Sequence, residues 1–182
     1  MSEEKFKFLE HTADVKFQSF GKTLEEAFEN AALALQEVMT KKVKIKPVIK
    51  KKIEVEGRDK EALLYNFLEE FLFLLDSENF VLSKIKKIKI NNISIITDNN
   101  QTNKASKHKL ALKVSKDNDK NGNKEQYNNN KEYKLSAEVI GDKAGNYKFT
   151  NDAKAVTYNN MFVKKEKFKG KDKFICQVVL DV

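Results

Sequence analysis

Three carboxylates could act together at one site, although they lie near opposite ends of the 182-residue sequence. Asp14 lies within "HTADVKFQSFG", on the face of a predicted strand opposite to its apolar residues, and Asp181 precedes the terminal carboxylate of Val182. Nearby anions repel one another and favour a bound cation or a proton. If the first and last strands pair, the three carboxylates converge, and such hard oxygen ligands suit Ca²⁺, Mg²⁺ or Mn²⁺. The alternative, which spacing alone favours, is that Asp14 and Asp181 form salt bridges with Lys154 or Lys16.

Two further residues, His11 and Cys176, could also carry chemistry. A histidine beside such a site can be a ligand or a proton carrier, but we interpret His11 as a structural residue that hydrogen-bonds the neighbouring backbone. The single cysteine, Cys176, lies within an apolar strand, which favours a position in the core. One cysteine excludes an internal disulfide and fits a reducing compartment. The sequence contains no P-loop, H-E-x-x-H motif or nucleophile elbow, so we assign no catalytic residue.

The strand that carries Asp14 contains a shift in its apolar pattern. Phe6 and Phe8 occupy even positions, whereas the apolar residues from Leu9 onward occupy odd positions. Since strand side chains alternate between faces, such a shift exchanges the buried face. We therefore expect a bulge or break between Phe8 and His11, which turns Asp14 away from the core and towards the end of the chain.

Two helices are predicted from apolar periodicity and from their first residues. In the first, Thr23 and Glu26 form a capping box ahead of apolar residues at helical spacing through residue 39. The second begins near Asp59, a suitable N-cap, and continues through residue 77 with apolar residues on nearly every side. We expect this second helix to be the most buried one, packed on a sheet.

The rest of the chain predicts mainly strands. The stretch "KKKIEVEG" alternates up to Gly57, and the chain closes on "FICQVVLDV", whose apolar residues on both faces indicate a central strand. The predicted order of elements is β-α-β-α-β-β-β-β. We therefore predict a single α+β domain over residues 1–182, in which two helices pack on one mixed or antiparallel sheet.

Two segments of the chain are rich in lysine. Residues 98–132 are rich in Asn and Lys and lack the apolar surface that would offset the entropy of ordering. We interpret them as a disordered or loop insertion, in which only "KLALKV" could form a short strand.

Residues 41–52 contain seven lysines and the only proline, Pro47, which indicates a lysine-protected edge strand. A non-specific RNA contact is the weaker alternative for residues 41–52.

Composition indicates a soluble intracellular protein. The net charge is +8, and the excess of lysine is spread along the chain. No apolar run approaches the roughly 18 residues of a membrane span, and the N-terminus lacks the basic and apolar blocks of a signal peptide. We expect a cytoplasmic or nuclear location and no association with a membrane.

Four blocks of the sequence resemble the archease family. They are "FLEHTADVKFQSFGKTLEEAFENAALALQEVMT", "LLYNFLEEFLFLLDSENF", "KAVTYNNM" and the terminal "QVVLDV". The resemblance follows the chain in order along residues 6–90 and 133–182, and the four blocks together are far more specific than any one of them.

The resemblance implies both a function and a set of site residues. Archeases are small accessory proteins of RtcB-type RNA ligases, which join tRNA halves after intron removal, and they carry no nucleophile of their own. By resemblance, the protein is not an enzyme but promotes guanylylation of the ligase and keeps the ligase turning over. Asp14, Asp181 and Val182 then form a divalent-metal site, with Ca²⁺ as the expected ion, and Lys154 is a further functional residue. The implied partners are the ligase complex and, indirectly, tRNA.

The sequence departs from the family pattern at two places, and two other functions stay open. Asn159 stands where many relatives have histidine, and "GDKAGNYKFTND" replaces a histidine-containing loop, which argues against a mechanism that needs either histidine. An RNA-binding or chaperone-like adaptor is the first alternative, and strong, salt-dependent tRNA binding without a ligase would favour it. A metal-dependent phosphohydrolase is the second, although no general base is evident apart from His11.

Overall fold

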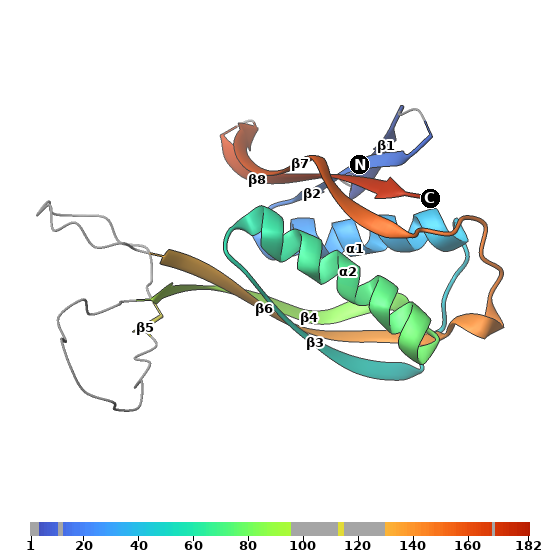
Figure 1. Cartoon of the computed structure of the whole chain (residues 1–182). Helices are drawn as coiled ribbons and strands as arrows, with labels where there is room; N and C mark the ends of the chain where they lie inside the picture. Colours follow the sequence, from blue (N-terminus) through green and yellow to red (C-terminus); the bar gives the residue numbers. More distant parts are fainter. Residues whose placement is uncertain (1–3, 11–12, 96–112, 115–129, 169) are drawn as a thin grey trace, which may run out of the picture.

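Two α-helices lie between two antiparallel β-sheets in the computed structural model, which describes residues 4–10, 13–95, 113–114, 130–168 and 170–182. Figure 1 shows three layers, with both helices in the middle one. Over this part of the chain the predicted α+β class and both helices are confirmed, but the strands form two sheets where one was predicted. A helix with apolar residues on nearly every side needs cover on two sides, and two sheets provide it.

The first sheet brings together the two strands that carry the candidate carboxylates. Its strand order is β1-β2-β8-β7, with β1 (Phe6–Leu9), β2 (Val15–Gly21), β8 (Lys171–Asp181) and β7 (Ala155–Phe168). β8 is central, as predicted, and its consecutive residues Val178 and Val179 are both fully buried, so both of its faces are covered. β2 and β8 are therefore neighbours, as convergence of the carboxylates requires.

The second sheet has the strand order β3-β6-β4-β5. Its strands are β3 (Ile49–Gly57), β6 (Asn130–Lys143), β4 (Phe80–Ile95) and β5 (Lys113–Val114), and a short 3₁₀ helix, η1 (Ala144–Asn146), follows β6. β3 lies at the edge of this sheet, which confirms the prediction for the lysine-rich segment around it.

Both helices begin where the sequence predicts. α1 spans Leu24–Thr40 and α2 spans Lys60–Glu78. The hydroxyl of Thr23 and the carboxylate of Asp59 each accept a hydrogen bond from the main-chain N–H three residues on, at 3.1 Å and 2.6 Å. These bonds satisfy N–H groups that have no partner within the helix. Neither helix is both long and apolar enough to cross a membrane.

The core lies between the two sheets and around the helices. Each helix contacts strands of both sheets: α1 contacts β2, β4 and β8, and α2 contacts β3, β4, β6 and β7. The two helices share an aromatic contact, because the rings of Phe28 and Phe67 are stacked with centroids 6.2 Å apart. The helices and both sheets thus contribute to one hydrophobic core.

The opening segment of the chain forms a hairpin, β1–β2, and not the bulged single strand that was one of the two expectations. Phe6 pairs with Ser19 and Phe8 with Phe17, so even positions of β1 share a face with odd positions of β2. The shift in the apolar pattern therefore reflects the register of a hairpin. His11 lies outside the described residues, so its predicted role stays a prediction.

The Asn/Lys-rich segment falls mostly outside the described residues. Lys113 and Val114, from "KLALKV", pair with β4, in agreement with the short strand considered for that stretch. Residues 130–132 belong to β6, so the predicted loop ends three residues too late. The strand begins before Tyr133 because β6 stays paired with β4 as far as Asn130. The polar residues 130–132 do not show the apolar alternation from which a strand is predicted.

Candidate functional site

Asp14 and Asp181 lie at the same end of neighbouring antiparallel strands. Val15, the first residue of β2, pairs with Leu180 of β8, and Asp14 directly precedes and Asp181 directly follows this pair. Opposed residues in antiparallel strands have Cα atoms roughly 4.5–5.5 Å apart. Asp14 is half-buried and Asp181 is exposed. The structure thus brings together two acidic residues from opposite ends of the sequence.

Lys154 lies on the other side of Asp181. Ala155 begins β7 and pairs with Asp181, and the main-chain N–H of Lys154 donates a hydrogen bond of 2.8 Å to the carbonyl oxygen of Asp181. Since β8 lies between β2 and β7, Asp181 is flanked by Asp14 on one side and by Lys154 on the other. Among the described residues, Asp181 forms no ion pair with Lys154 or Lys16, the partners of the alternative interpretation.

The predicted ligands at this end of the sheet are of the chemical kind that a hard divalent cation prefers. They are the carboxylate oxygens of Asp14 and Asp181 and the carboxyl group of Val182, whose side chain packs against the core. Oxygen ligands of this kind are those that Ca²⁺ and Mg²⁺ prefer. In the described ranges, no three His, Cys, Asp or Glu side chains are arranged to hold a metal. A cation here would therefore need Val182 or water in addition to the two aspartates.

The backbone just before Asp14 is in an unfavourable conformation. Ala13 has φ of 69°, in the left-handed region, which costs a residue with a Cβ roughly 1–2 kcal/mol. Strained residues of this kind gather at functional sites, where the surrounding structure enforces them. The turn of the β1–β2 hairpin thus sets the position of Asp14 at a cost in backbone energy.

A groove of about 650 Å³ lies beside Asp14, between the β1–β2 hairpin and the C-terminal end of α1. It is lined by Phe8, Leu9, Asp14, Val15, Glu37, Val38, Lys41, Lys42 and Asn151. Asp14 borders this groove, whereas Asp181 and Lys154 are exposed at the end of the sheet. The surface of another macromolecule can therefore reach Asp181 and Lys154.

Two glutamates of α2 fix the edge strand that leads from Lys154, and sequence reasoning missed them. Glu69 accepts a hydrogen bond of 2.7 Å from the main-chain N–H of Val156, and Glu61 accepts one of 2.9 Å from that of Val163. These bonds satisfy donors of an edge strand that would otherwise face water or another chain. α2 carries five acidic residues, and nothing in the sequence distinguishes Glu61 and Glu69 from the other three.

Asn159, where the family resemblance leads us to expect histidine, lies in a bulge of β7. The register of β7 with β8 shifts across residues 158–161, and Asn160 has φ of 53°. The Asn159 side-chain oxygen accepts a hydrogen bond of 3.1 Å from the Asn160 amide. Next to it, Tyr158 stacks on Tyr65 of α2, with ring centroids 4.3 Å apart. Asn159 is exposed in this bulge, and its side chain is hydrogen-bonded to that of the next residue, Asn160.

Cys176 occupies the predicted core position. Its side chain is fully buried in β8. Burial raises the pKa of the Cys176 thiol to about 12, although a hydrogen bond with Ser19 acts in the opposite direction. The thiol is therefore protonated at neutral pH, and the thiolate is the reactive form of cysteine.

The sequence matches the model of the Archease protein family (MTH1598/TM1083) over residues 6–120 and 110–182. The protein archease of Methanosarcina barkeri is 31% identical to this chain over 181 residues, which cover 98% of this chain and 97% of that relative. The protein archease of Pyrococcus furiosus is 52% identical over 77 residues, 42% of this chain and 54% of that relative.

Another relative and a solved structure extend the likeness. The protein archease of Sulfurisphaera tokodaii is 46% identical over 81 residues, so the matched part spans 58% of that relative and 44% of this chain. The solution structure of Methanobacterium thermoautotrophicum protein 1598 resembles this one with a TM-score of 0.64 and 27% identity, over 98% of this chain and 99% of the other.

Proposed function

This chain belongs to the archease family, and from that premise we propose that it is a non-enzymatic, metal-dependent activator of an RtcB-type RNA ligase in tRNA splicing. It promotes guanylylation of the ligase and multiple turnover, in the cytoplasm or the nucleus. The observation that supports this proposal most is the gathering of Asp14, Asp181 and Lys154 at one exposed end of the first sheet. Residues that the family resemblance selects from distant parts of the sequence thus lie on one surface.

Asp14, Asp181 and Val182 are the residues that would hold the divalent cation, with Ca²⁺ expected and Mg²⁺ or Mn²⁺ as alternatives. When bound, the cation supplies a positive charge at the end of the sheet, next to the surface that meets the ligase. The role of this chain is to hold the carboxyl groups together at the ends of two paired strands. Without the cation, carboxylates at this spacing repel one another.

Lys154 supplies a second positive charge beside Asp181. Its main chain is fixed by the hydrogen bond to Asp181, while its side chain is exposed and free to reach beyond the surface. Ammonium groups bind phosphate oxygens and carboxylates. We therefore assign Lys154 a contact with the ligase or its nucleotide, and not with the cation.

The decisive experiment measures formation of the covalent ligase–guanylate from GTP and a divalent cation, with and without this protein. Asp14→Ala and Asp181→Ala should each lose roughly tenfold or more of the stimulation while staying folded, since neither removes core volume. Asp172→Ala is the matched control, because Asp172 lies at the other end of β8 and pairs on the surface with Lys165 at 2.8 Å.

Three outcomes would contradict the proposal. Full stimulation by the Asp14→Ala protein would remove the site assignment, because the proposed cation could not then depend on that carboxylate. Phosphohydrolase or ligase activity of the wild-type protein alone would show that the protein is itself an enzyme and not an activator. Strong tRNA binding with no effect on ligase guanylylation would instead favour an RNA-binding adaptor.

A further inference from the structure

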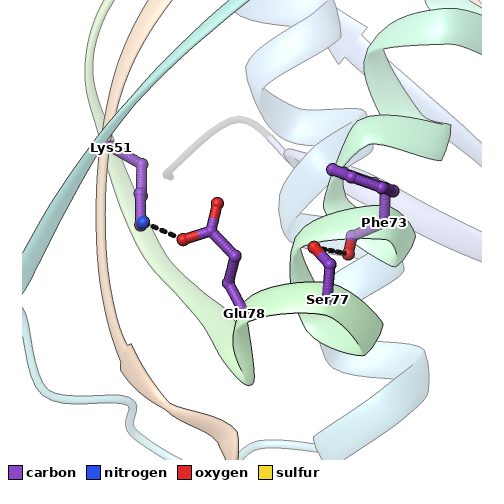
Figure 2. A network of polar contacts seen from close by, with 4 residues as sticks. All are labelled: Lys51, Phe73, Ser77 and Glu78. Carbon is purple, nitrogen blue, oxygen red and sulfur yellow. Dashed lines mark hydrogen bonds and ion pairs between the residues drawn. The ribbon is translucent and has the colours of Figure 1, made fainter.

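Lysine side chains of β3 lie on the face of the second sheet that is turned away from both helices. Ile53 is buried on the helix side, and strand side chains alternate between faces. Lys51 shares the side of Ile53, and Figure 2 shows its ammonium group paired with Glu78 of α2. Lys50 and Lys52 therefore lie on the opposite, outer face, where both are exposed.

β4 adds lysines to the same outer face by means of a bulge. The register of β4 with β6 shifts between Ile85 and Lys87, where "KIKKIKI" has two consecutive lysines. After the shift, Ile88 and Ile90 pack against the core, so the alternating lysines between and around them are exposed on the outer side. We call the following five residues the lysine face: Lys50, Lys52, Lys84, Lys87 and Lys89.

The lysine face is arranged in rows across β3, β6 and β4. Lys50 and Lys84 both pair with Ile140 of β6, and Lys52 and Lys87 both pair with Glu138. Adjacent strands lie about 4.8 Å apart, so the two lysines of one row are separated by about 10 Å at the backbone. Within the described chain, none of the five forms an ion pair.

The acidic residues of this outer face do not cancel the charge. Glu138 lies between two lysines of the lysine face. Glu54 and Glu56 lie further along β3, and both are within ion-pair distance of Lys134, at 3.7 Å and 3.2 Å. These ion pairs raise the pKa of Lys134 through its hydrogen bond with Glu56 and the charges of both glutamates. A positive excess therefore remains at the lysine face itself.

A shallow hollow of about 200 Å³ lies within the lysine face. Lys52, Lys87 and Lys89 line it together with Ser136 of β6, which pairs with Lys89. Glu54 and Glu138 also line it. Ser136 has a small side chain with a hydroxyl donor, so the lining of the hollow combines three lysines and a neutral donor with two carboxylates.

We propose that the lysine face binds the sugar–phosphate backbone of RNA, with a phosphate group in the hollow at Ser136. Repeated positive charges in rows suit a polymer with repeated phosphates, and such contacts carry no base specificity. The choice of RNA over other polyanions rests on the proposed function, in which the ligase partner handles tRNA. In Figure 1 this sheet forms the layer opposite to the one that carries Asp14 and Asp181, so both surfaces can be engaged together.

The test measures binding of the full chain to a labelled single-stranded RNA by fluorescence anisotropy, over about 50 to 200 mM salt. The triple variant Lys52→Glu/Lys87→Glu/Lys89→Glu should bind roughly tenfold or more weakly. The slope of log affinity against log salt should also fall by about 2, because each lost phosphate contact on a single strand removes about 0.7. The corresponding Lys→Gln triple, which removes charge without reversing it, should fall between this variant and wild type.

The control variant is Lys148→Glu/Lys164→Glu/Lys171→Glu, which changes the net charge equally at exposed positions elsewhere. It should keep most of the affinity, and circular dichroism checks that all variants are folded. Equal RNA affinity of the lysine-face triple and wild type, or an equal loss in the control, would overturn the proposal. So would binding of anionic vesicles or acidic peptides without binding of RNA.

Guanylylation of the ligase without RNA separates this proposal from the proposed function. The lysine-face triple should stimulate guanylylation as well as wild type does, because its substitutions lie on a different sheet from Asp14 and Asp181. Loss of RNA binding with normal stimulation supports two separate surfaces. Loss of stimulation in the lysine-face triple would show that this sheet contacts the ligase and would overturn the RNA assignment.

Discussion

The carbonyl oxygen of Asp181 accepts a hydrogen bond from the main-chain N–H of Lys154, at 2.8 Å. No side-chain atom of Lys154 takes part, so the position of this residue does not depend on its ammonium group. The next residues of β7 are also held by main-chain contacts, because Ala155 pairs with Asp181 and Val156 donates to Glu69. The side chain of Lys154 can therefore be removed while the end of the sheet is kept.

Lys154→Ala should impair stimulation of the ligase and leave the affinity for the divalent cation largely unchanged. In the proposed function the ammonium group, which is exposed, acts on the partner, whereas carboxyl groups hold the cation. Ligase–guanylate formation and calorimetric titration with Ca²⁺ measure the two effects on the same preparation. A fall in both by the same factor would show that Lys154 supports the metal site instead.

Asp14→Ala and Asp181→Ala should show non-additive effects on stimulation. If the carboxyl groups bind one ion as a unit, either substitution disables the site and the double variant loses little more. Asp181→Ala should also unfold at an equal or higher denaturant concentration without metal, because repulsion between carboxylates is relieved. Stimulation assays and urea unfolding test this pair, and strictly additive losses would indicate two independent roles.

Appending a few residues after Val182 should weaken binding of the divalent cation. The added peptide bond converts a charged carboxylate into a neutral amide that keeps one acceptor oxygen. The side chain of Val182 packs against the core, so the fold should tolerate the extension. Calorimetry on the two forms decides the matter, and equal affinities would exclude the carboxylate of Val182 as a ligand.

Replacement of residues 96–129 by a short Gly/Ser linker should leave the fold intact. Ile95 and Asn130 are paired at the end of the β4–β6 hairpin, so a short turn can join them. Shortening a loop stabilises the folded state by about 0.6 kcal/mol for each halving of its length. The urea unfolding midpoint should stay unchanged or rise, and loss of a cooperative transition would show that β5 contributes to the core.

Tyr147→Phe should destabilise the protein at neutral pH more than at acidic pH. The Tyr147 hydroxyl donates a hydrogen bond of 2.6 Å to the Asp142 carboxylate, and this bond is the main cause that lowers the pKa of Asp142. A carboxyl whose pKa is lower in the folded state stabilises that state above its ordinary pKa of about 3.9. This contribution is lost as the pH falls through the lowered value.

Urea unfolding of the wild-type protein and Tyr147→Phe near pH 7 and near pH 3 measures this difference. The gap between the two unfolding midpoints should narrow at the lower pH, because the Asp142 carboxyl of the unfolded chain takes up a proton below its ordinary pKa of about 3.9. Tyr133→Phe serves as a tyrosine control, because Tyr133 lies towards the opposite end of β6 from Asp142. A gap that does not change with pH would mean that the hydroxyl acts mainly through its other bond, as acceptor from the N–H of Lys46 at 2.9 Å.

Local signals in the sequence were sufficient for the helices and for the central position of β8. Thr23 and Asp59 are caps that act within a few residues, and the apolar residues on both faces of "FICQVVLDV" depend only on that strand. The number of sheets was not predictable in this way, because pairing partners are far apart in sequence. The hairpin register of Phe8 with Phe17 shows this, since the parity shift fits a bulge equally well.

The candidate site was predictable only as far as residue chemistry and a family pattern allow. Asp14 and Asp181 were selected as acids at strand ends, and the structure places them at the same end of paired strands. The contacts of Glu61 and Glu69 with β7 were missed. Their carboxylates accept hydrogen bonds from main-chain N–H groups that lie 102 and 87 residues away in the sequence. Such contacts depend on tertiary structure, and no pattern of residue spacing in the sequence predicts them.

The pairing of β2 with β8 joins distant parts of the chain, since Gln18 and Gln177 are hydrogen-bonded across 159 positions. On a ribosome, the residues up to β2 emerge long before their partner strand exists, and pairing over such a separation is slow. The acidic pair at Asp14 and Asp181 therefore cannot form until β8 has been synthesised and has paired with β2. A partner that recognises this pair engages chains in which β2 and β8 have paired and passes over chains in which they have not.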